Sequence, residues 1–142
     1  MPSYYTNFSF QVRLPDAAAQ TYALELAATA RRLNLGDGSE AELPEALRDP
    51  DLIADWCFEA EADTVDQQPG LWLHSSEGGV DAACAYVHHL LGKYDPAGRV
   101  TFQWSHDCTR PCLDAYGGGA ALVTATEIKT MSTHQWLQAQ AA

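Results

Sequence analysis

The sequence predicts an α+β fold of the ferredoxin-like α/β plait type, in which an antiparallel sheet carries helices on one face. Three observations predict it. Several short segments alternate apolar and polar residues, as half-buried strands do. Two longer segments repeat their apolar residues at helical spacing. Their order, βαββαβ with an extra C-terminal strand, gives two strand–helix–strand units around a hairpin. The 142 residues fit a single domain, 1–142.

The first strand and helix have clear boundaries in the sequence. Phe8, Phe10, Val12 and Leu14 alternate with polar residues and predict a strand. Asp16 is a suitable N-cap for a helix over 17–35, because its carboxylate can accept from free backbone N–H groups. Gly36 would end this helix, since glycine tolerates a left-handed backbone. Its expected apolar stripe is Tyr22, Leu26, Thr29 and Leu33.

A loop with short helices over 37–56 connects the first helix to a hairpin. Asp49-Pro50 is a typical helix start. Residues 58–63 alternate again, so the acids of this strand would form its outer face. A turn over 67–70 then leads to a strand over 71–75.

The second half predicts one helix, two strands and a terminal helix. Val80, Cys84, Val87 and Leu91 form a buried helical stripe over 80–91, which Gly92 would end. Strands follow over 100–104 and 121–125, with a loop between them that holds Cys108, Cys112 and the glycines 117–119. The last predicted element is a short helix over 132–138, whose Trp136-Leu137 would pack back.

Acidic residues are concentrated in one part of the chain. The whole sequence has 19 acids and 8 Lys or Arg, for a net charge of −11. Residues 37–66 hold eleven of these acids and one base, Arg48. Such a segment creates a strong local field that would attract a basic surface, and it argues against direct binding to nucleic acid or anionic lipid. The alternative is a solvated acidic segment that only keeps the protein soluble.

The expected partner-binding residues lie in this segment and on the neighbouring strand. Trp72 is either an anchor of the core or, with His74, a contact centre on the open sheet face beside the acidic strand, since tryptophan is enriched at binding hot spots. The full set of expected contact residues is Asp51, Asp55, Glu59, Glu61, Asp63, Trp72 and His74.

A second hypothesis is a small metal-binding or hydrolytic protein. His106, Cys108 and Cys112 lie within seven residues, and all three side chains are of types that bind zinc. Paired C-x2-C knuckles are absent, so the spacing favours a loop with two thiols. No serine lies in a G-x-S-x-G elbow. We therefore expect no cofactor and lean against an enzyme.

Location and assembly follow from what the sequence lacks. No apolar run approaches the roughly 20 residues of a membrane span, and Met1-Pro2-Ser3-Tyr4 does not start like a signal peptide. The expected location is the cytoplasm, with reduced thiols. A third hypothesis is a subunit of a larger assembly, or a homodimer, joined through an exposed sheet edge.

The C-terminal third resembles small uncharacterised acidic proteins encoded by phages and integrative mobile elements. The matching segments are Phe102-x-Trp104, Tyr116-Gly117-Gly118-Gly119-Ala120 and Ile128-Lys129-x-Met131-x-Thr133-x-x-Trp136-Leu137, with Phe8-x-Phe10 near the start. By analogy, the resemblance implies an inhibitor of nucleic-acid machinery of the anti-CRISPR or anti-restriction type. The leading hypothesis is thus a non-enzymatic acidic protein that docks on a basic, nucleic-acid-binding surface of a partner and partly mimics phosphate.

Overall fold

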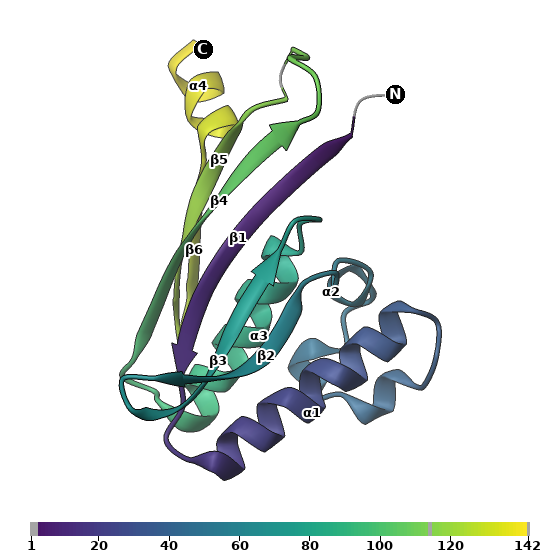
Figure 1. The fold of residues 1–142 in the computed structure, drawn as a ribbon, viewed down its shortest axis with the longest axis vertical. Helices are drawn as coiled ribbons and strands as arrows, with labels where there is room; N and C mark the ends of the chain where they lie inside the picture. Colours follow the sequence, from purple (N-terminus) through teal and green to yellow (C-terminus); the bar gives the residue numbers. More distant parts are fainter. Residues whose placement is uncertain (1–2, 114, 142) are drawn as a thin grey trace.

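The computed structural model describes residues 3–113 and 115–141. Figure 1 shows an antiparallel sheet with helices packed on it, which confirms the α+β class. The elements in chain order are β1 (Tyr4–Arg13), α1 (Ala17–Asn34), the 3-10 turns η1 (Glu40–Glu42) and η2 (Glu45–Leu47), α2 (Pro50–Ala54), β2 (Glu59–Val65), β3 (Gln68–Ser75), α3 (Val80–Tyr94), β4 (Arg99–Cys108), β5 (Gly117–Thr124), β6 (Ile128–Ser132) and α4 (Thr133–Ala141).

The strand order in the sheet is β2-β3-β1-β4-β5-β6, and every neighbouring pair is antiparallel. The long strand β1 joins two halves: Phe8–Arg13 pair with β3, and Tyr4–Asn7 pair with β4. As predicted, the fifth strand lies beside the fourth. Strands β2 and β6 form the two edges of the sheet.

Helices α1 and α3 bury the inward side chains of the strands. Leu71 and Leu73 of β3 and Val123 of β5 are completely buried in this core. The buried side of α1 consists largely of alanines, with Leu26 among them, whereas Tyr22 and Leu33 are only partly buried. The Tyr86 side chain of α3 reaches the alanine side of α1, where its hydroxyl donates to the Ala23 carbonyl at 2.6 Å.

Aromatic rings connect the two halves of the sheet. The rings of Phe10 in β1 and Phe102 in β4 stack with centroids 4.1 Å apart. Phe8 contacts Phe58 and Phe102, with centroid distances of 6.3 and 5.5 Å. Such pairs add directional contacts to the burial of apolar area. They hold β1 against β4 in a region beyond the paired residues Tyr4–Asn7.

The C-terminal region differs from the prediction. Residues 128–132 form the strand β6, which was not predicted, whereas the predicted C-terminal helix is present as α4 and is capped by Ser132. Trp136 and Leu137 do not pack back: their exposed fractions are 56% and 60%. The strand was missed because neither side of it is deeply buried, so its sequence shows no clean alternation.

Two glycine predictions were wrong for opposite reasons. Helix α3 continues through Gly92 to Tyr94, and Gly92 does not adopt the left-handed backbone with which a glycine ends a helix. Strand β5 begins at Gly117, so the three glycines are not a loop. A Cβ on Gly118 would collide with the Trp104 carbonyl, and one on Gly119 with the Trp104 ring, which explains these glycines by close packing. Cys108 likewise belongs to the end of β4 rather than to the loop.

Candidate binding face of the sheet

The face of the sheet opposite the core brings most of the expected contact residues together. On β2, Glu59, Glu61 and Asp63 point away from the helices. The register places Glu59 beside His74 and Glu61 beside Trp72 of β3. Because side chains alternate along each strand, all five share one face. The prediction that the acids of residues 59–63 form an outer row with Trp72 and His74 nearby therefore agrees with the register.

An aromatic pair forms the centre of this face. The rings of Trp72 and His74 stack with centroids 3.9 Å apart and an angle of 26° between their planes. The Trp72 indole N–H donates to the Ser9 hydroxyl at 2.8 Å, which fixes the ring over β1. Trp72 remains 39% exposed. The pair offers a flat aromatic surface beside the carboxylates, and tryptophan is enriched among interface anchors.

Hydrogen bonds hold two of the three carboxylates in place. Glu61 Oε2 lies 2.5 Å from His74 Nε2, and Gln11 Nε2 donates to Asp63 Oδ2 at 2.8 Å. Glutamine is neutral, so the charge of Asp63 is oriented but not cancelled. Carboxylates that are already held in place lose less side-chain entropy on binding than mobile ones.

Asp51 and Asp55 lie elsewhere, next to the helices. Asp51 is an exposed residue of α2 and its backbone N–H donates to the Asp49 cap. Asp55 ends α2, and its Oδ2 accepts from the Ala82 N–H at 3.0 Å in the first turn of α3. This carboxylate caps α3, whose N-cap Gly79 has no side chain. Burial raises the pKa of Asp55, and the hydrogen bond from Ala82 opposes that shift.

The acidic segment 37–66 is thus divided between two places. Residues 37–55 run beside α1, as Figure 1 shows, and Glu42 lies 3.9 Å from Arg32 of that helix. Residues 59–63 lie on the open sheet face. At the hairpin, Asp66 faces Arg13 at 3.8 Å. The charge concentrated in the sequence therefore does not form one continuous surface, and only the sheet row adjoins the aromatic pair.

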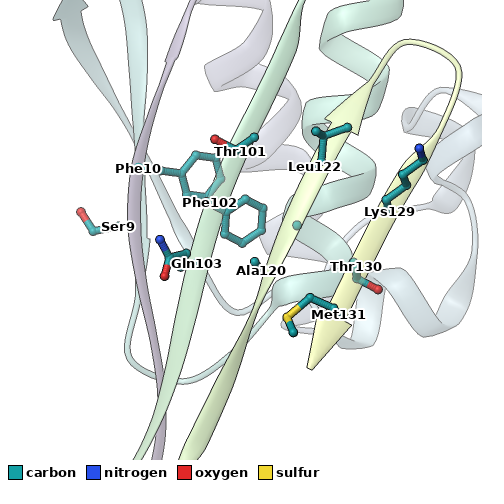
Figure 2. A pocket seen from close by; sticks show the side chains of 11 residues that line it. Ser9, Phe10, Thr101, Phe102, Gln103, Ala120, Leu122, Lys129, Thr130 and Met131 are labelled. Atoms are coloured by element: carbon teal, nitrogen blue, oxygen red, sulfur yellow. The ribbon is translucent and has the colours of Figure 1, made fainter. Parts of the chain in front are cut away.

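The other half of the open face contains a groove that the sequence did not predict. It has a volume of about 640 Å³ and lies over β1, β4, β5 and β6 (Figure 2). On its floor β5 presents the small side chain of Ala120, between Gln103 of β4 and Met131 of β6. Lys129 at its border lies 3.3 Å from Glu127. The groove could not be predicted from the sequence, because residues of the unpredicted strand β6 line it.

The residues of the metal hypothesis do not form a ligand set. His106 Nδ1 lies 2.9 Å from the Thr6 hydroxyl. The sulfurs of Cys108 and Cys112 are 3.7 Å apart. Within residues 3–113 and 115–141, no group of three or more His, Cys, Asp or Glu side chains is arranged to hold a metal ion.

Comparison with known proteins adds no assignment: no protein-family model, no curated protein and no solved structure matches the chain. In the described part of the chain, no helix combines the length and apolar character needed to cross a membrane. The geometry of the sheet face is therefore the basis for inferring what the protein does.

Proposed function

We propose that the protein is a non-enzymatic binding protein whose open sheet face docks on a basic surface of a partner protein. The observation that carries the proposal is the row Glu59, Glu61 and Asp63 on the edge strand β2, directly beside the stacked Trp72 and His74. Anions speed the docking of a basic surface, and tryptophan is enriched among the few residues that contribute most to binding energy.

The proposed partner is a protein that uses the same basic surface to bind nucleic acid. Alternate residues on a strand are about 6.6 Å apart, so the row presents regularly spaced negative charges. Such a row would occupy sites that otherwise hold phosphates, which is the action of an inhibitor of the anti-CRISPR or anti-restriction type. The proposed setting is the cytoplasm, where such partners act on nucleic acid.

We also propose that β1–β4 with α1 and α3 form a ferredoxin-like plait, to which β5, β6 and α4 are added. The order β2-β3-β1-β4 and the antiparallel pairing support this interpretation. In that arrangement the acidic row belongs to the plait, and the groove belongs to its extension.

A matched pair of charge reversals tests the binding proposal. One variant changes Glu59, Glu61 and Asp63 to Lys; the control changes Glu40, Glu42 and Glu45, beside the helices, to Lys. Both variants alter the net charge equally, so general electrostatic effects are the same. Each is immobilised, incubated with bacterial lysate and compared with wild type by quantitative mass spectrometry, after circular dichroism has shown that it is folded.

The proposal predicts a basic nucleic-acid-binding protein that wild type and control capture and the sheet-face variant does not. For the purified partner, reversal of the row should weaken binding at least about 100-fold, since opposed like charges cost several kcal/mol. Affinity should also fall as salt rises. Equal losses in both variants would show that only net charge matters and would refute a specific sheet-face site.

A further inference from the structure

The two edges of the sheet have opposite character. At one edge, β2 carries Glu59, Glu61 and Asp63, and charged edge strands resist pairing with other chains. At the other edge, β6 and α4 together span residues 128–141, which contain no Asp or Glu and a single Lys, Lys129. Two copies of this acidic chain repel each other where their acids lie, and residues 128–141 contribute no such repulsion.

Exposed apolar side chains lie at the edge formed by β6 and α4. Ile128 and Met131 of β6 and Trp136 and Leu137 of α4 are all exposed. Met131, Trp136 and Leu137 line an apolar hollow of about 350 Å³ together with Thr133. In Figure 1, α4 projects at the end of the sheet beside β5 and β6. Exposed apolar patches of this kind mark contact sites on soluble proteins.

The free backbone groups of β6 can be assigned from the hairpin that precedes it. The Thr124 N–H donates to the Glu127 carbonyl at 2.9 Å and so defines a hydrogen-bonded pair. Such pairs recur at every second residue of an antiparallel ladder, so Lys129 and Met131 direct their N–H and C=O groups toward β5. Those of Ile128, Thr130 and Ser132 therefore point outward from the sheet edge.

We propose that β6 pairs antiparallel with β6 of a second copy of this chain, about a twofold axis at Thr130. In this register Thr130 faces its own equivalent, Ile128 faces Ser132, and Lys129 faces Met131, so no two like charges are directly opposed. All outward N–H and C=O groups of β6 then find partners. The two sheets become one continuous sheet across the interface.

A second copy fits this edge better than an acidic or a basic partner. An acidic partner gains little, because Lys129 is already close to Glu127 at 3.3 Å. A basic partner finds no acid in residues 128–141. A copy of the chain instead brings Trp136 and Leu137 beside the start of the opposing β6, because α4 follows directly after Ser132, which faces Ile128. Apolar surface is thereby buried while the acidic row stays at the far edge.

The mass of the full chain in solution tests this interface, by sedimentation equilibrium over a range of micromolar concentrations. Wild type should reach twice the chain mass of 15.5 kDa. Thr130→Pro removes an outward N–H that the chain itself does not use, and the double variant Trp136→Glu, Leu137→Glu adds charge to the apolar contact. Both should be monomers. The control Leu35→Glu adds an acid at an exposed leucine (70%) that ends α1, and it should remain a dimer.

Salt separates this interface from the proposed binding function. Added salt screens the repulsion between two acidic chains, so the dimer should become tighter by a few-fold, whereas binding of a basic partner should weaken. A wild-type monomer at all concentrations, or a dimer that survives in the Glu double variant, would overturn the proposed interface and leave the sheet-face proposal standing. If Thr130→Pro fails to fold by circular dichroism, the Glu double variant decides alone.

Discussion

Asp55 is expected to stabilise the fold through a hydrogen bond to helix α3. Two substitutions of Asp55 separate the effect of this hydrogen bond from the effect of the charge. Asp55 Oδ2 accepts from the Ala82 N–H at 3.0 Å, in a helix whose N-cap residue is Gly79. Asp55→Ala removes the acceptor and should lower the free energy of unfolding by about 1 kcal/mol, the usual loss for an N-cap. Asp55→Asn keeps an oxygen acceptor and removes a charge that burial disfavours. It should be at least as stable as wild type at neutral pH.

The burial of Asp55 also determines whether its contribution to the free energy of unfolding rises or falls with pH. Burial raises the pKa of Asp55, so the folded protein holds this proton more tightly than the unfolded chain. Its contribution to stability is therefore complete below the unfolded pKa and is lost as pH rises through the folded pKa. The Asn variant should lose less stability than wild type over that rise. Urea unfolding followed by fluorescence of the buried Trp56 measures this. If the Ala and Asn variants match wild type at every pH, Asp55 does not act as a cap.

Three further predictions concern groups in the core and between helices. Tyr86→Phe removes the 2.6 Å hydrogen bond to the Ala23 carbonyl and should destabilise the protein by about 1 kcal/mol in urea unfolding; an unchanged midpoint would contradict it. Burial, aided by Lys93 and His88, lowers the pKa of His89, whose Nε2 lies 2.8 Å from the Tyr22 hydroxyl. Stability should therefore fall as pH drops below the ordinary histidine pKa, and His89→Gln should reduce that fall in thermal melts from about pH 7 to pH 5. Burial also raises the pKa of the Cys84 thiol to about 12, so a thiol reagent at mildly alkaline pH should label Cys84 only after denaturation; labelling in the folded state would show that this helix opens.

Local patterns predicted the acidic face of the sheet but not its surroundings. The alternation of Glu59, Glu61 and Asp63 defines a face because side chains on a strand alternate with a fixed period. The pairing of Trp72 with His74 follows from their spacing in the next strand. The division of residues 37–66 between the helices and the sheet does not follow, since it depends on where the chain crosses from one layer to the other.

The roles that sequence reasoning missed depend on residues far apart in the chain. In the sequence, nothing distinguishes Asp55 from the other acids of the segment. Its role depends on the Ala82 N–H, which lies 27 residues away and is brought close by the folding of α3. In the sequence, Gly118 and Gly119 are typical of a flexible loop. Their role depends on the close packing of Trp104 from β4 against them. Strand β6 lacks a buried side, so its sequence carried no alternation. Because β6 was not predicted, neither the groove nor the free edge of the sheet could be predicted.

Hydrogen exchange of the protein, alone and bound to the captured basic partner, tests the central claim most directly. The sheet-face proposal predicts slower exchange in residues 59–74, which cover the acidic strand and the Trp72–His74 pair, and unchanged exchange in residues 37–48 beside α1. Protection confined to residues 37–48, with none in β2 and β3, would contradict it.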